Sequence, residues 1–192
     1  MRGRSLHAAT MLTGAGAGNG YETPNAGITT MQSNEPINDG REDFDFLVGR
    51  WIIRHRRLNA RLAGCADWTS FDGTCVMRKT MGGLGNMDDN TVDLPEGAYA
   101  AVTLRRFDPV LRRWSIWWLD ARQPDIDPPV HGAFADGEGV FLGDDVFQGK
   151  PIKVRFLWSA ITPTTCEWRQ AFSEDGGATW ETNWEMAFTR AG

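Results

Sequence analysis

Hydrophobic and polar residues alternate with a period of two along most of the chain after residue 43. Nine segments of strand length show this alternation or are rich in β-branched and aromatic residues: 51–58, 68–81, 98–107, 114–121, 129–135, 140–147, 152–160, 166–172 and 180–188. This period is typical of strands that bury one face. Short connectors such as "DGEG" and "QGKP" separate the segments, which favours antiparallel neighbours. We therefore predict an all-β protein built as an antiparallel up-and-down meander of about 9–10 strands.

Helices have little room in this pattern. Only "DFDFLVG" (43–49) and residues 82–97, which we interpret as a loop, have the composition for a helical turn. A βαβ crossover is therefore excluded. An open meander exposes unpaired edge strands, and closure into a barrel removes them. We expect a closed barrel that is preceded by one short helical turn.

The first forty residues differ in composition from the rest. They are rich in Gly, Ala, Thr and Asn. Their apolar residues follow neither the two-residue period of a strand nor the 3.6-residue period of a helix. Such a segment buries too little apolar surface to offset the entropy lost on ordering. We predict a disordered tail over 1–40 and one barrel domain over 41–192, since 192 residues suffice for one domain with a core.

The octapeptide "SEDGGATW" (173–180) resembles an Asp-box, a hairpin turn in which Ser173 and Asp175 satisfy turn amides and Trp180 packs beneath the loop. The box is known from β-propeller glycosidases, where it lies away from catalysis. It occurs once here, and the folded residues are too few for a propeller. We interpret it as a structural turn and exclude Asp175 as a catalytic acid.

Three segments together carry a wider resemblance: "DFDFLVGRW", "RRFDPVLRRWSIWWLD" and "RQAFSEDGGATW". Over residues 43–190 the chain resembles a family of small bacterial calycin-like proteins of uncharacterised function. The family's middle motif differs at four positions, occupied here by Phe107, Arg112, Ile116 and Leu119. Phe107 stands where the family has Tyr, and Ile116 stands where it has Gln. Both differences make the implied pocket more apolar. The resemblance implies a lipocalin-like barrel with no reaction attached.

Pairing across the "DPVLRR" turn predicts which side chains face inward. If Phe107 lies opposite Trp114, then Arg105 faces Ile116, Thr103 faces Trp118 and Ala101 faces Asp120. That face is the more aromatic one, so we assign it to the interior and expect Asp120 to be paired with Arg105 or a ligand, or to stay protonated. Alternation in other strands extends the expected ligand-binding set: Trp51, His55, Arg105, Trp114, Trp118, Asp120, Gln170 and Trp184. Core filling is the alternative for each ring.

Composition and charge limit the kinds of partner that we expect for this protein. The net charge of −5 gives no basic field for a phosphate backbone, so we expect no nucleic acid. No apolar run is long enough to span a membrane. Three cysteines without a C-x-x-C pair favour a cytoplasmic location, and no His or Cys cluster indicates a protein-held metal. The arginines of "RHRRLNAR" are expected on the solvated outer face, with an anion-binding rim as the alternative. The sequence leaves open whether the protein forms a homodimer.

Four functions remain from these observations. The first is a protein that binds a small apolar or aromatic molecule inside the barrel. The second is a small barrel enzyme, an isomerase, cyclase or hydrolase, with Asp120 or His55 as general acid/base. The third is haem binding through His55 or His131, although we expect no cofactor. The fourth is an interaction module with a filled barrel.

Overall fold

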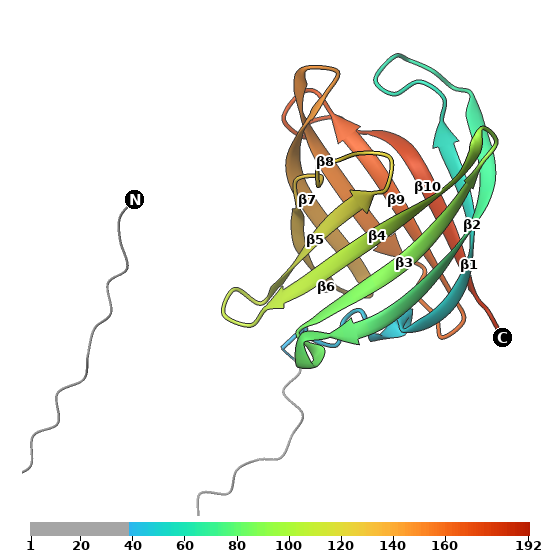
Figure 1. Cartoon of the computed structure of the whole chain (residues 1–192). Coiled ribbons are helices and arrows are strands. Elements are labelled where there is room, and N and C mark those ends of the chain that lie inside the picture. The colour runs from blue at the N-terminus through green and yellow to red at the C-terminus, as the bar shows by residue number, and fades with distance from the viewer. Residues whose placement is uncertain (1–38) are drawn as a thin grey trace, which may run out of the picture. The chain divides into compact units, whose positions relative to one another are not determined.

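The computed structural model describes residues 39–192, in which ten strands close into one antiparallel barrel (Figure 1). Each strand pairs with its neighbours in sequence, and the first pairs with the last. The strands are β1 (Gly49–Leu58), β2 (Trp68–Thr80), β3 (Gly85–Leu94), β4 (Gly97–Asp108), β5 (Arg113–Asp120), β6 (Val130–Ala135), β7 (Glu138–Phe147), β8 (Lys150–Ser159), β9 (Thr165–Ser173) and β10 (Glu181–Arg190). The all-β barrel is confirmed. The tail predicted for 1–40 lies, apart from residues 39 and 40, outside the described residues.

Two short 3-10 turns are the helical elements of this described part: η1 (Asp45–Leu47) and η2 (Met81–Gly83). The first confirms the helical turn expected within 43–49. None of the helices described approaches the length and hydrophobicity needed to cross a lipid bilayer.

The predicted register between β4 and β5 is confirmed residue by residue. Phe107 lies opposite Trp114, Thr103 opposite Trp118 and Ala101 opposite Asp120. The inward face of β4 is buried in the pattern expected from alternation. The short turn at 109–112 sets this register, because a tight turn leaves one way to align the two strands.

Strand β3 was missed, and the prediction of a loop over 82–97 is wrong. Its sequence "GNMDDNTVDL" is polar because its inward positions carry Asn86, Asp88 and Asn90 before the pattern becomes apolar at Val92. A strand whose buried face is hydrogen-bonded rather than apolar shows no hydrophobic alternation. The strand pairs with β2 over residues 85–93 and with β4 along its full length.

One end of the barrel is closed by the segment that precedes β1 (Figure 1). Phe44 is 1% exposed, and its ring packs edge-on against Trp114 (5.0 Å between centroids) and Phe134 (4.9 Å). Trp114 donates its indole N–H to the Gly40 carbonyl at 2.9 Å, and Trp51 donates to the Leu47 carbonyl at 2.7 Å. These bonds satisfy the polar ends of two buried indoles. The closed end is therefore filled by side chains.

A bulge interrupts β10 near the open end. The register against β9 shifts between Thr182 and Trp184, so Asn183 and Trp184 are both buried. The alternation predicted over 180–188 holds for Trp184, Met186 and Phe188. It fails for Trp180, which lies beneath its own turn with the Arg155 guanidinium 4.5 Å from its ring.

The turn at 173–180 has the hydrogen bonds expected of an Asp-box. Ser173 Oγ accepts from the Gly177 amide at 2.9 Å, Asp175 accepts from the Thr179 amide at 2.9 Å and from its hydroxyl at 2.6 Å, and the Trp180 indole donates to the Gly177 carbonyl at 2.9 Å. Gly177 has φ of 101°, a conformation that glycine adopts without strain. These bonds lie within the turn.

Candidate functional site

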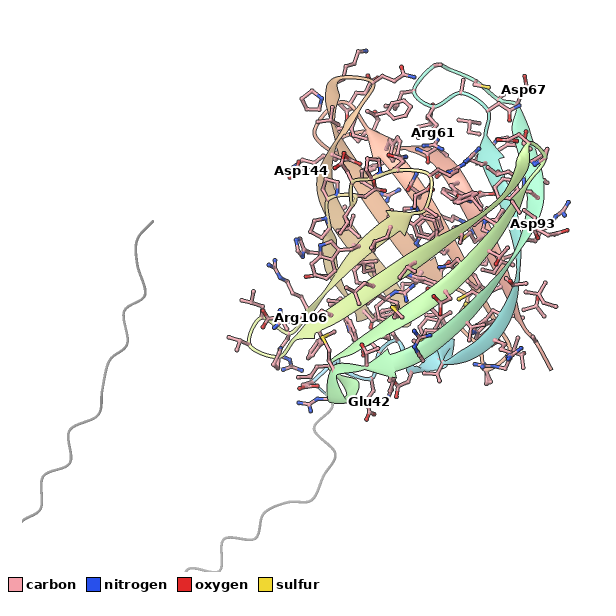
Figure 2. All side chains as sticks on the ribbon, in the orientation of Figure 1. Glu42, Arg61, Asp67, Asp93, Arg106 and Asp144 are labelled. Carbon is pink, nitrogen blue, oxygen red and sulfur yellow. The ribbon has the colours of Figure 1, made fainter. Side chains whose placement is uncertain are left out.

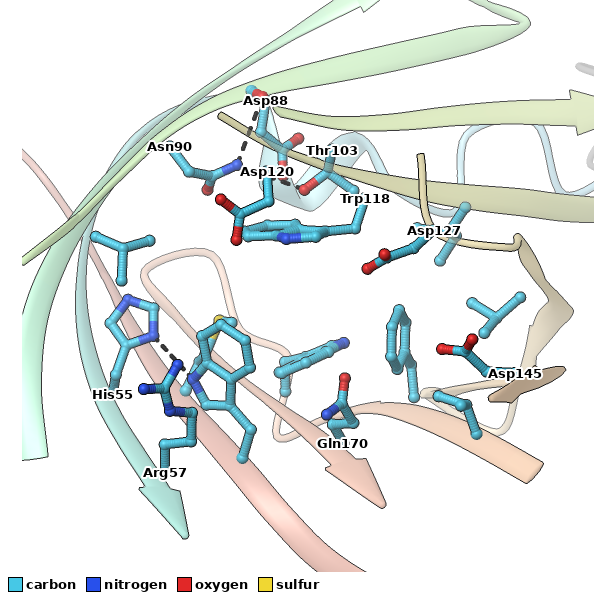
Figure 3. Close-up of a pocket in the computed structure, with 18 of the residues that line it drawn as sticks. His55, Arg57, Asp88, Asn90, Thr103, Trp118, Asp120, Asp127, Asp145 and Gln170 are labelled. Atoms are coloured by element: carbon cyan, nitrogen blue, oxygen red, sulfur yellow. Dashed lines mark hydrogen bonds between the residues drawn. The ribbon is translucent and has the colours of Figure 1, made fainter. Parts of the chain in front are cut away.

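The half of the barrel away from the closed end contains a cavity of about 350 Å³ (Figure 3). One wall is aromatic and comes from β8, β9, β10 and β5. Phe156 and Trp168 have ring centroids 4.9 Å apart, and Trp184 lies 6.0 Å from Trp168 and 6.2 Å from Trp118. Trp118 and Phe156 are only half-buried. These rings therefore line open space and offer flat apolar surface.

The polar wall comes from β3 and β4. It faces the rings of β8, β9 and β10 and adjoins Trp118, which lies beside Thr103 in the register. Arg105 donates two hydrogen bonds to the Asp88 carboxylate, one of them Nη2 to Oδ2 at 2.8 Å, and a third to Asn86 Oδ1 at 3.0 Å. Asn90 extends the row through a bond of 3.4 Å to the Thr103 hydroxyl. Figure 3 shows Asn90 and Thr103 beside Asp88 on this wall. The cavity is amphipathic, with rings facing hydrogen-bonding groups.

His55 lies between the two walls on β1. Its Nδ1 accepts the indole N–H of Trp184 at 3.2 Å, and its ring stacks on Phe71 at 4.8 Å. The hydrogen of the neutral imidazole is therefore on Nε2. Nε2 lies over Gly73, where an added Cβ would be 2.6 Å away, so glycine makes room for the ring. Burial lowers the pKa of His55 to about 4, and the side chain is neutral at pH 7.

Asp120 is not paired with Arg105, and that part of the sequence prediction is wrong. Asp120 Oδ1 accepts from the Arg122 amide and Nε at 2.9 Å each, and Oδ2 accepts from Arg122 Nη2 at 2.6 Å. These bonds lower the pKa of Asp120, so the carboxyl is ionised at pH 7. The error arose because Arg122 lies in the connection after β5, where strand alternation gives no information, and because β3 supplied a nearer carboxylate to Arg105.

The mouth of the cavity separates charges of opposite sign. Arg57 and Arg61 lie on the side of β1 and the loop that follows it, whereas Asp127 and Asp145 lie on the side of β6 and β7. Figure 2 shows Arg61 at the open end, and Figure 3 shows Arg57 beside His55 and away from the two aspartates. Burial, and then the charges of Asp145 and Asp120, raise the pKa of Asp127. Neighbouring acidic groups on that side therefore repel one another.

Several buried donors on the cavity lining have no protein acceptor. In the described part of the chain five buried side-chain atoms lack a partner, and three belong to lining residues: His55 Nε2, Arg105 Nε and Trp158 Nε1. All three are N–H groups. A buried donor without an acceptor costs about 1–3 kcal/mol. These three atoms are buried in the packing around the cavity and are not exposed to it.

Six of the eight residues expected at the site line the cavity: His55, Arg105, Trp118, Asp120, Gln170 and Trp184. Trp51 and Trp114 lie in the filled end, each 1% exposed, and are core residues. Alternation correctly predicted that both side chains point into the barrel. It does not indicate how far along the barrel axis a residue lies. His131 also lies elsewhere, because its Nδ1 pairs at 2.8 Å with Ser115 on the outer face.

The expected ligand-binding set lacks part of the lining: Arg57, Arg61, Asp88, Asn90, Asp127 and Phe156. For Arg57 and Arg61 the sequence analysis gave a rim position only as the alternative to the outer face. Arg57 and Phe156 had a usable signal, since each follows an inward residue by two positions. Asp88 and Asn90 depended on recognising β3. Arg54 and Arg56, which alternate with Arg57, lie outside and pair with Asp72 and Glu185 at 2.8 Å each.

The cysteines of the described part form no disulfide. All three cysteines are free, and burial raises the pKa of Cys166 to about 12 and that of Cys75 further, so both buried thiols are protonated. Within residues 39–192 no group of three or more His, Cys, Asp or Glu is arranged to hold a metal ion.

The fold and the cavity together define a calycin-like barrel, closed at one end and open at the other to a space of small-molecule size. Two solved structures are similar. The S-type phycobiliprotein lyase CPES from Guillardia theta is 12% identical, with 80% of this chain and 96% of that chain covered at a TM-score of 0.53. A protein of unknown function from the DUF3598 family of Nostoc punctiforme is also 12% identical, covering 77% and 49% at a TM-score of 0.49.

No family model matches the chain, and no curated protein matches it. The likeness to the lyase shows the fold alone at this identity. The calycin-like barrel of uncharacterised function that the sequence motifs indicated is confirmed at the level of the fold.

Proposed function

We propose that this protein binds a small apolar or aromatic molecule inside the barrel. The observation that carries the proposal is the contrast between the two ends. The closed end is filled by Phe44, Trp51 and Trp114, whereas the rings at the open end line a cavity of about 350 Å³. That volume lies within the range of about 300–1,000 Å³ found for ligand pockets.

Binding is better supported than catalysis. His55 is neutral, its Nδ1 is occupied by Trp184, and its Nε2 lies over Gly73. Asp120 is held by Arg122 with its pKa lowered, the opposite of what a general acid working near pH 7 requires. The similar structure from Guillardia theta is named as a lyase, but at 12% identity its activity is no argument for this chain.

The proposal is tested with the neutral fluorophore N-phenyl-naphthylamine, whose emission rises in an apolar site. We expect saturable binding to the full chain and a change in tryptophan emission, because Trp118, Trp168 and Trp184 surround the cavity. The decisive variant is Val154→Phe, since Val154 lines the cavity and is 6% exposed. Filling that space should weaken binding by at least about tenfold, or about 1.4 kcal/mol.

Val140→Phe is the matched control. It makes the same substitution on the neighbouring strand β7, on the outer face, where Val140 is 42% exposed. We expect unchanged binding of the fluorophore. Melting temperatures of both variants establish that each is folded. Equal affinity of both folded variants, or no binding to the full chain, would refute the proposal.

A further inference from the structure

Two arginines at the cavity mouth are placed to bind an anion. Arg57 is 22% exposed in its side chain, and its guanidinium lies 5.7 Å from the rings of both Phe71 and Trp184. Arg61 lies 5.9 Å from Phe147 and 5.8 Å from Phe172. Contact with two rings holds each guanidinium at the mouth and leaves N–H groups free to bond.

Neither arginine has a carboxylate within hydrogen-bonding distance among the described residues, although the charge of Glu181 acts on Arg61 and Asp120 feels the charge of Arg57. The nearest acid to Arg57 is Glu96 at 3.9 Å, and the Glu96 side chain is 68% exposed. Arg61 has no ion pair within residues 39–192. By contrast, Arg54, Arg56 and Arg122 each bond a carboxylate at 2.8 Å or less.

The two cations are also partly desolvated and close enough to repel each other. Burial, followed by the charge of Arg57, lowers the pKa of Arg61. An anion between the two groups would remove this repulsion and restore the hydrogen bonds that burial denies them.

The acidic side of the mouth limits where an anion can sit. Asp127 and Asp145 would repel a carboxylate there, and Asp144 is paired with Lys153. An anionic group is therefore directed to the side of β1, with the apolar part of the molecule against the aromatic wall.

Building on the proposed function, we propose that the ligand is an apolar or aromatic carboxylate whose acid group is bound by Arg57 and Arg61 at the mouth. The apolar body occupies the cavity against the aromatic wall that includes Trp118 and Trp184. The inference concerns the charge of the ligand, and the proposed function concerns the cavity, so the two can be tested separately.

The experiment measures displacement of N-phenyl-naphthylamine by three matched competitors: naphthylacetate, its methyl ester and naphthylethylamine. We expect the acid to bind at least about tenfold more tightly than the ester, since one hydrogen bond to a charged group is worth about 1.5–3 kcal/mol. The double variant Arg57→Met/Arg61→Met should reduce the acid to the affinity of the ester, while the neutral fluorophore still binds saturably.

The control is Arg54→Met/Arg56→Met, which removes the same amount of charge from the outer face of β1. It should keep the preference for the acid. A loss of preference in this control would show a general effect of net charge and would overturn the inference.

The remaining outcomes separate the two proposals. Equal binding of acid and ester, or tighter binding of the amine, overturns the carboxylate inference while fluorophore binding still supports the cavity. Absence of fluorophore binding to the full chain overturns both. Melting temperatures of both double variants establish that a lost preference does not come from unfolding.

Discussion

Arg105 and Asp88 form a two-pronged ion pair inside the barrel, with side chains only 3% and 4% exposed. Each comes from a different strand, and Asn86 bonds the same guanidinium at 3.0 Å. The guanidinium is further covered by the Phe44 ring at 4.9 Å. The pair therefore joins the polar wall of the cavity to the segment that closes the barrel.

Asp88→Asn is expected to lower the free energy of unfolding by about 3–5 kcal/mol, because it leaves the buried Arg105 without its counter-charge. Urea denaturation measures the change. The control is Asp89→Asn on the outer face, where the partner Arg78 is 54% exposed and the loss should be at most about 1 kcal/mol. The double variant Asp88→Leu/Arg105→Met should recover much of the loss. Equal losses of stability at positions 88 and 89 would contradict the assignment of Asp88 and Arg105 as a buried ion pair.

Phe44→Ala is expected to cost about 3–5 kcal/mol, as removal of a buried ring does. Phe44 touches rings of β5, β6 and β7, so the loss would show that the segment before β1 is part of the core. Val48→Ala is the control, since Val48 is 38% exposed and should change stability by less than about 0.5 kcal/mol. A small effect at Phe44 would mean that the barrel folds without this closure.

Alternation predicted most of the barrel because most inward positions are apolar. The β4–β5 register followed from one turn, and every pairing deduced from it is present. The prediction failed where burial is polar, at Asp88 and Asn90, since a buried ion pair leaves no hydrophobic signature in either strand. It failed again at Asn183, because a bulge shifts the inward face without a marker residue.

The site was predicted only in part, and the reason is related. A period of two gives the face of a residue but not its distance from the ends, so Trp51 and Trp114 were grouped with Trp118 and Trp184. Knowledge of which end is closed separates them, and that depended on contacts between Phe44 and strands more than sixty residues away. Loop residues such as Arg61 and Arg122 have no periodicity at all.

Asp175→Ala is expected to lower the melting temperature without changing fluorophore affinity. The Thr179 hydroxyl and amide, with Ser173, hold the pKa of Asp175 well below its usual range, so its contribution is present above the unfolded pKa near 4 and is lost on acidification. Differential scanning calorimetry at neutral pH measures the shift. Glu174→Ala, next in the same turn, should have a smaller effect. Reduced binding with an unchanged melting temperature would assign the turn to the site instead.

His55 predicts a specific pH dependence of stability. Its folded pKa is about 4 and its ordinary value is 6.5, so between these pH values the unfolded chain binds the proton and the folded barrel does not. Stability should therefore rise with pH across this window and level off above 6.5. The difference between the ordinary pKa of 6.5 and the folded pKa of about 4 corresponds to about 3.4 kcal/mol at most.

The variant His55→Phe keeps a ring against Phe71 but removes the titrating group. At pH 7 it should be less stable than the unmodified protein, because the Trp184 indole loses its acceptor at 3.2 Å. As the pH falls from 6.5 to 4 this difference should shrink or change sign. Urea denaturation at a series of pH values measures it, and the difference between the two proteins cancels the titration of groups they share. The control is His131→Phe on the outer face, which should leave most of the slope of stability against pH in place. Parallel pH profiles for His55→Phe and the unmodified protein would show that the His55 imidazole is not held neutral by burial.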